Sequence, residues 1–215
     1  MKFSKSIVSG ISLGLLSLPL LASENNVYFS AGMGQGYVSE IEGDTTLAGT
    51  KYDLEADMDS AFIYDLEIGK KLDDWRLGLS YSSLSPQQNK VTATGTTSGV
   101  SPKPHYDVKS IMFNVYRDFS NEGKFTPYAG IGLGTSNIKI ESHVTTVAGH
   151  QILVNDDGRD VFAWDLKGGV TYSLTDKADI YGEVVYHQTS KFNEDGINYD
   201  AFKTTNVMGG VKFNF

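Results

Sequence analysis

Apolar and polar residues alternate with a period of two along most of the chain. In "YDLEIG", for example, a tyrosine, a leucine and an isoleucine are separated by two acids and followed by a glycine. Such alternation predicts β-strands with one apolar and one polar face, whereas the 3.6-residue period of a helix is nearly absent after residue 23. Eight segments show the alternation: residues 27–37, 60–71, 75–84, 109–119, 126–138, 161–174, 179–188 and 206–215.

The connections between these segments alternate in length. "KLDD", "SNEGK" and "TDKA" are tight turns. Residues 39–59, 85–105, 142–160 and 189–203 are long and polar, and the second of them, rich in Thr, Ser and Gly, is expected to be flexible. Short turns at one end and long loops at the other predict an up-and-down antiparallel meander. Closing the meander into an eight-stranded barrel removes its exposed edges.

Two kinds of closed barrel fit this pattern. A soluble lipocalin-like barrel buries its apolar face, while a membrane barrel turns that face to lipid and keeps polar residues in the lumen. Glycines gather on the polar face, at Gly32, Gly34, Gly36, Gly130, Gly132 and Gly134. The narrow interior of an eight-stranded barrel needs small residues, whereas glycine weakens a strand on a surface without any gain. We therefore expect the polar face inside, in an all-β transmembrane barrel.

The polar face also carries charges of both signs, at Asp65, Glu67, Arg76, Asp165, Lys167, Glu183 and Lys212. Because a buried charge persists only when it is paired, these residues are expected to form a polar network that plugs the lumen. Glu67 is expected near Arg76 across the "KLDD" turn. Lys167 is expected diagonal to Glu183 if "TDKA" closes the following hairpin.

Aromatic residues near the predicted strand ends are candidates for the two interfacial girdles of a membrane barrel. They are Tyr28, Phe29, Tyr64, Trp75, Tyr81, Phe119, Phe125, Tyr128, Phe162, Trp164, Tyr172, Tyr186, Phe213 and Phe215. The general preference of strands for aromatic residues explains part of this set equally well.

The first residues are typical of an exported protein. "MKFSK" is basic, "IVSGISLGLLSLPLL" is a short apolar run, and "LAS" supplies small residues before the predicted cut. This pattern predicts a cleaved signal peptide over residues 1–23 and a barrel domain over residues 24–215. The chain has no cysteine, which excludes disulfides and thiolate chemistry, and its formal net charge of -8 disfavours a nucleic-acid partner. No cofactor or metal is expected.

Two features suggest chemistry, and each has an alternative explanation. His187 and Ser190, with Glu183 or Glu194 as the acid, could form a hydrolase site. However, residues three apart on a strand point to opposite faces, which argues against this site. The first long connection is acidic and could gather divalent cations, although a solvated charged loop is the better explanation. Its acids are Glu40, Glu42, Asp44, Asp53, Glu55, Asp57 and Asp59.

The carboxy-terminal "MGGVKFNF" resembles the signal by which bacterial outer-membrane barrels are recognised and inserted. Gly210, Phe213 and Phe215 match that signal, whereas Met208 stands where the family usually has a polar residue. "TPYAGIGLG" resembles the fifth strand of the small OmpA-like, opacity-protein and surface-antigen barrels. The resemblance covers residues 24–215.

This resemblance implies a location in the outer membrane of a Gram-negative-type bacterium. Outer-membrane lipid, lipopolysaccharide and the barrel-assembly machinery are then the expected partners, and long surface loops would meet host or environmental ligands. The implied function is non-catalytic: structural, adhesive or antigenic. A small passive pore for ions or small solutes is the alternative, followed by a hydrolase that modifies lipid A.

Overall fold

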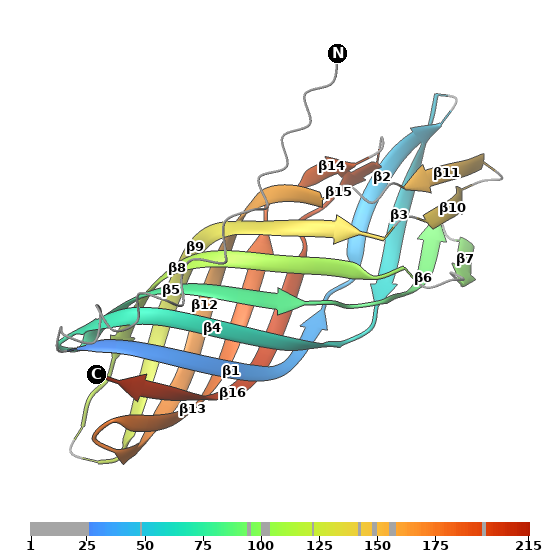
Figure 1. The fold of residues 1–215 in the computed structure, drawn as a ribbon. Coiled ribbons are helices and arrows are strands. Elements are labelled where there is room, and N and C mark those ends of the chain that lie inside the picture. Colours follow the sequence, from blue (N-terminus) through green and yellow to red (C-terminus); the bar gives the residue numbers. More distant parts are fainter. Residues whose placement is uncertain are drawn as a thin grey trace.

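Eight strands close into an antiparallel barrel in the computed structural model (Figure 1). The structure describes residues 26–47, 49–93, 96–99, 104–121, 123–141, 143–147, 150–154, 158–194 and 197–215, so the predicted signal peptide lies outside the described residues. In their order around the barrel, the strands are β1 (Val27–Val38), β16 (Lys203–Asn214), β13 (Ala178–Thr189), β12 (Gly158–Thr175), β9 (Phe125–Ile140), β8 (Tyr106–Asp118), β5 (Trp75–Leu84) and β4 (Ala61–Leu72). The eight-stranded up-and-down barrel predicted from the alternation is confirmed.

Tight connections set the register of the hairpins at one end of the barrel. Asp73, with φ of 53°, and Asp74 form the two-residue turn that places Leu72 opposite Trp75. Closure comes from the two terminal strands, because β1 pairs with β16 along its whole length and the Asn26 amide donates to the Phe215 carbonyl at 3.0 Å. The last residue is therefore tied into the barrel wall.

The outer face of the barrel is apolar, as the glycine pattern predicted. Leu79, Phe113 and Ile131 are each more than half exposed, whereas Lys167 and Glu183 are buried. On β12 the exposed apolar side chains extend from Phe162 to Leu174, which corresponds to roughly 25–30 Å along the membrane normal for a strand tilted by about 45°. This height matches the hydrocarbon part of a bilayer.

Two of the predicted girdle aromatics do not lie on that face. Tyr28 and Tyr128 point into the lumen, where they are 1% and 5% exposed. Each takes the inward position of its strand by the two-residue alternation, opposite Gly69 and Gly169 respectively. Outward-facing aromatic pairs such as Trp164 with Tyr186 remain as girdle residues.

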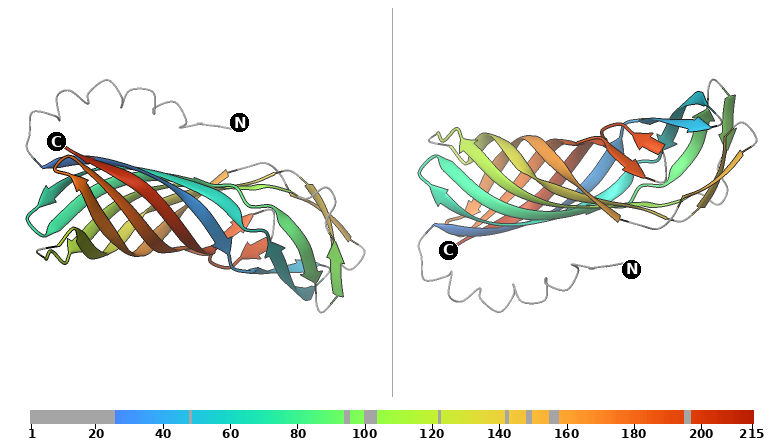
Figure 2. Two further views of the ribbon diagram at one scale, coloured as in Figure 1. Left: turned by 90° about the horizontal axis from the view of Figure 1, so that it is seen from below. Right: turned by 90° about the horizontal axis from the view of Figure 1, so that it is seen from above.

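The long connections contain strands of their own, which corrects the expectation of polar loops. Six of these strands form a second sheet, called here the loop sheet, with the order β14 (Phe192–Glu194), β15 (Ile197–Tyr199), β2 (Ile41–Leu47), β3 (Thr50–Met58), β6 (Gln88–Ala93) and β7 (Thr96–Gly99). A separate hairpin joins β10 (His143–Val147) to β11 (His150–Val154). Figure 2 shows these strands extending beyond the barrel at the end opposite to the carboxy terminus. The second connection, expected to be flexible, contains β6 and β7.

Candidate functional site in the lumen and on the loop sheet

Arg76 is the centre of a tyrosine-lined group near the short-turn end of the lumen. Its Nε lies 2.9 Å and 3.1 Å from the two carboxylate oxygens of Asp118. The guanidinium also lies over the rings of Tyr116 and Tyr128, at 4.4 and 4.7 Å from their centroids, and 5.7 Å from that of Tyr28. Ion pairing and cation–π contacts offset part of the lost hydration of this cation, whose Nη2 is buried with no hydrogen-bond partner among the described residues.

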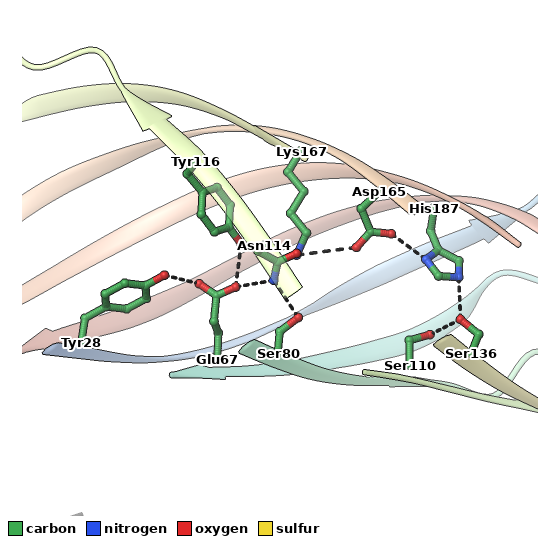
Figure 3. Close-up of polar contacts among 10 residues, drawn as sticks. All are labelled: Tyr28, Glu67, Ser80, Ser110, Asn114, Tyr116, Ser136, Asp165, Lys167 and His187. Carbon is green, nitrogen blue, oxygen red and sulfur yellow. Dashed lines mark hydrogen bonds and ion pairs between the residues drawn. The ribbon is translucent and has the colours of Figure 1, made fainter. Parts of the chain in front are cut away.

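Glu67 accepts hydrogen bonds from three neighbouring side chains (Figure 3). The Tyr28 hydroxyl donates to Oε1 at 2.6 Å, while the Tyr116 hydroxyl and the Asn114 amide donate to Oε2 at 2.7 and 2.6 Å. Gly78 makes room for this group, since a Cβ on Gly78 would lie 2.5 Å from the Glu67 carboxyl carbon. The carboxylate is thus held by three donors from two other strands, β1 and β8.

The prediction that Glu67 lies near Arg76 is wrong, because the strand register differs from the one expected. The two-residue turn places Glu67 opposite Ser80, so that Arg76 lies opposite Lys71, four residues further along. Arg76 instead pairs with Asp118, at the carboxy-terminal end of the neighbouring strand β8. Glu183, in contrast, lies opposite Gly169, which makes it the diagonal neighbour of Lys167.

A second group lies further toward the loop end (Figure 3). Asp165 Oδ1 is 2.6 Å from His187 Nδ1, and Asp165 Oδ2 is 3.8 Å from the Lys167 ammonium. The other ring nitrogen of His187 lies 3.1 Å from the Ser136 hydroxyl, which is itself 2.7 Å from the hydroxyl of Ser110. All seven charged residues predicted for the lumen are buried. Lys212 lies 3.3 Å from Asp179, which the sequence reasoning did not single out.

The serine, histidine and aspartate have the connectivity of a hydrolase triad, but a substrate cannot reach them as the structure stands. Ser136 is 0% exposed. The adjoining cavity, lined by Ser110 and His187, has a volume of about 20 Å³, enough for one water molecule but not for an acyl group. Ser190, the serine that the sequence analysis considered and argued against, lies on the exposed connection after β13.

Sequence reasoning missed Ser136 and its link to His187. One part of this link had a local signal: closing the "TDKA" hairpin places Asp165 directly opposite His187. Ser136 had none, because β9 reaches β12 only through a long connection whose length does not fix the register.

The lumen is closed at its loop end by an apolar cluster, called here the cap. Its members are Ile41, Ala56, Ile63, Leu84, Tyr106, Val108, Ile138, Ile140, Val161, Val185, Ile197, Tyr199, Phe202 and Met208. The cap contains residues of both the barrel wall and the loop sheet, so it joins the two. The polar groups below the cap leave two cavities of about 20 Å³ each. Among the described residues the lumen is therefore a packed interior.

The loop sheet has one apolar and one acidic face. Ile41, Ala56 and Ile197 are buried on the face toward the cap. The residues of the opposite face, called here the acidic face, include Glu42, Asp44, Thr46, Lys51, Asp53, Glu55, Asp57, Lys90, Asn193 and Asn198.

Like charges meet directly on this acidic face. Glu42 lies opposite Glu55 and Asp44 opposite Asp53, an arrangement that destabilises a sheet. Lys51 offsets only the second pair, with its ammonium 3.7 Å from each of those two aspartates.

The edge of the loop sheet has one close surface ion pair. The Lys191 ammonium lies 2.6 Å from Asp200, and this hydrogen-bonded carboxylate raises the pKa of Lys191. Within the described part of the chain, no group of three or more His, Asp or Glu residues is arranged to hold a metal ion. The described residues also include no helix suited to crossing a membrane.

The residues of the predicted insertion signal all lie on β16 or at its end. Phe213 and Phe215 point outward and are 44% and 54% exposed. Gly210 faces the lumen, where a Cβ would lie 2.6 Å from the Tyr181 hydroxyl and 2.4 Å from the Ala31 carbonyl oxygen. Glycine is required at this position because Tyr181 and the neighbouring strand come so close.

A closed barrel with a polar interior, and with an apolar outer band as tall as the hydrocarbon part of a bilayer, defines the class of transmembrane β-barrels. The chain matches the family model described as outer membrane protein beta-barrel domain over residues 10–215. It therefore belongs to this family, and it is a protein of the Gram-negative outer membrane. In such barrels the short turns are periplasmic and the longer loops extracellular, which places the loop sheet outside the cell.

The relatives differ in how much they share with the chain. Outer membrane protein PagN of Salmonella typhimurium strain LT2 is 27% identical over 101 residues, which are 47% of this chain and 42% of PagN. The alignment thus spans less than half of that protein.

Two solved structures share the fold over most of their length. The crystal structure of Neisserial surface protein A has a TM-score of 0.56 with 14% identity, covering 88% of this chain and 97% of that one. The outer membrane protease OmpT of Escherichia coli has a TM-score of 0.55 with 12% identity and covers the same shares. One is named as a surface protein and the other as an enzyme, so this likeness shows the fold and leaves the function open.

Proposed function

We propose that this protein is a non-catalytic surface protein whose barrel anchors the loop sheet as a preformed recognition platform. The observation that carries this proposal is the loop sheet itself. Three separate connections contribute strands to it, and its apolar face is packed on the cap. Ordering this much chain before any partner arrives lowers the entropy cost of binding.

The chemistry of the acidic face suggests the kind of partner. Glu42 faces Glu55 and Asp44 faces Asp53 there, and Lys51 lies 3.7 Å from each of the two aspartates. A partner that brings positive charge would relieve this repulsion, whereas an anionic one would increase it. Host or environmental surfaces that present basic polypeptide are therefore the ligands that fit best.

The two alternatives lack comparable support. A passive pore requires an open path, and the described lumen is packed with a cap above a polar network. A lipid A-modifying hydrolase requires a nucleophile that lipid can reach, and Ser136 is enclosed by the barrel wall and cap. Neisserial surface protein A, which is named as a surface protein, shares this fold, and this is consistent with a surface role.

A matched pair of hairpin deletions tests the proposal. Replacing residues 43–54 with Asn-Gly joins Glu42 to Glu55, which are already directly opposite each other, and removes the tip of the β2–β3 hairpin. Replacing residues 145–152 with Asn-Gly joins Val144 to Leu153 and shortens the separate β10–β11 hairpin in the same way.

Expressing cells would be measured for adherence to cultured epithelial cells and to surfaces coated with basic polypeptide. Only the first deletion is expected to abolish adherence, with both variants still showing the gel shift of a folded barrel. Equal adherence of the wild type and the first variant, at equal surface levels, would refute a recognition role for the loop sheet.

A further inference from the structure

The buried lumen contains more negative than positive charge. Six carboxyl groups are buried there, those of Asp65, Glu67, Asp118, Asp165, Asp179 and Glu183, against three lysine or arginine side chains, Arg76, Lys167 and Lys212. His187 adds a fourth cation only when protonated. An uncompensated excess of negative charge in a poorly hydrated interior is costly, so additional positive charge must be taken up from solution.

Five of the six carboxyl groups have partners. Asp118 pairs with Arg76, Asp179 with Lys212, and Asp165 with Lys167 and His187. Glu67 accepts three hydrogen bonds, and Glu183 accepts one from the Tyr128 hydroxyl.

Asp65 is the exception. It is 7% exposed, and the structure gives its carboxyl group no hydrogen bond or ion pair with any described residue. This carboxyl group is therefore the candidate for taking up the additional charge.

Both small cavities of the lumen adjoin Asp65. The cavity toward the cap is also lined by Asn206, whose side chain is 4% exposed and whose Oδ1 has no hydrogen-bond partner among the described residues. The cavity toward the short turns is also lined by Glu67 and Tyr181. Each has about 20 Å³, the room that a water molecule or a small ion needs.

We propose that Asp65 is a cation-binding site in the centre of the lumen, with Asn206 Oδ1 as a second acceptor. The site takes up one positive charge, either a proton or a monovalent metal ion. The titratable and charged groups around the two cavities, or acting on Asp65 from the neighbouring strands, are Glu67, Arg76, Tyr116, Tyr128, Asp165, Lys167, Tyr181, Glu183, His187 and Lys212. Lys167 is the cation that acts most strongly on Asp65, and it is shared with Glu183 and Asp165.

A bound proton and a bound metal ion predict different dependences of the stability of the barrel on pH and on salt. If the folded barrel binds a proton at Asp65 that the unfolded chain lacks, stability decreases as pH rises, by up to about tenfold in the unfolding equilibrium constant per pH unit. If it binds Na⁺ or K⁺, stability is instead higher in these salts than in choline chloride of equal ionic strength. The urea midpoint of full-length protein folded into phosphatidylcholine vesicles, measured from pH 5 to 9 in the three salts, separates the two.

The variant Asp65→Asn tests whether this dependence arises at Asp65. The control is Asp74→Asn, because Asp74 is a half-exposed residue of a short turn. We expect Asp65→Asn to lose the dependence on pH or on salt that the wild type and the control share. Should Asp65→Asn keep the same dependence, or should the wild type have neither, the site does not exist.

If Asp65→Asn fails to fold, the wild type still provides a test. The ¹³C shift of its Asp65 carboxyl carbon would be followed against pH and against Na⁺. A carboxylate signal that responds to neither would reject the proposal.

Discussion

The buried charges differ from the surface charges in what their removal should cost. Asp118→Ala leaves Arg76 in the lumen without its carboxylate, because the neighbouring tyrosine rings do not replace two hydrogen-bonding oxygens. We expect a loss of about 3–5 kcal/mol in the free energy of unfolding. Equilibrium unfolding in urea from lipid vesicles measures it.

The matched control is the Arg117–Asp74 pair at the same end of the barrel. Its atoms lie 3.0 Å apart, but its side chains are 41% and 45% exposed. Asp74→Ala should therefore cost less than about 1 kcal/mol. Comparable losses for the two variants would mean that water reaches Arg76, contrary to the packed lumen described above.

At this scale the sequence predicted that seven charged side chains point inward, but not which of them make contact, and it placed Tyr28 and Tyr128 on the wrong face. Alternation places Glu67 and Arg76 on the same face whatever the register, whereas their partners depend on strands that meet only when the barrel closes. Asp118 reaches Arg76 from β8, and Ser136 reaches His187 across β12. Neither contact lies within a hairpin that the sequence defines.

Among the elements, the loop sheet depends on the cap for its position. Phe202 is 1% exposed, and the Thr189 hydroxyl accepts a hydrogen bond from its backbone amide at 3.0 Å. Phe202→Ala leaves a cavity where the barrel meets the loop sheet. We expect it to lower the free energy of unfolding by about 3–5 kcal/mol and to destabilise mainly the strands of the loop sheet.

Hydrogen exchange resolves where that loss falls. The amides of β2, β3 and β15 should exchange faster, while those of β12 and the gel shift of the folded barrel stay unchanged. Uniform acceleration over the whole barrel would show that the loop sheet and the barrel wall unfold as one unit.

The carboxy-terminal strand provides the second prediction at this scale. If Gly210, Phe213 and Phe215 are read during assembly, Phe215→Ser should reduce the amount of folded protein in the outer membrane severalfold. Phe162→Ser is the control, since Phe162 has the same 54% exposure on the same outward face but lies away from the terminus. Equal losses would indicate that lipid contact matters at both positions and that no signal is read.

The strands of the loop sheet were overlooked although the sequence carried a signal for them. "KYDLEADM" alternates acids with Tyr52, Leu54, Ala56 and Met58, the pattern used to identify the barrel strands. Polar composition and length indicated a loop instead. The pairing of β2 with β15 joins residues about 150 positions apart, for example Thr45 with Ile197, and no local pattern predicts it.

For the whole molecule, the structure predicts a barrel that does not conduct. The lumen is closed at two successive levels: ion pairs and tyrosines below, and the apolar cap above. An ion crossing it would have to separate buried pairs such as Arg76–Asp118 and then pass a cap made mostly of apolar side chains. Purified, folded protein in planar bilayers should therefore show no steady conductance, while a general porin in the same bilayers shows its usual steps. A sizeable and steady conductance from the wild type would contradict the closed lumen. It would also make a passive pore the better account of this protein than a surface platform.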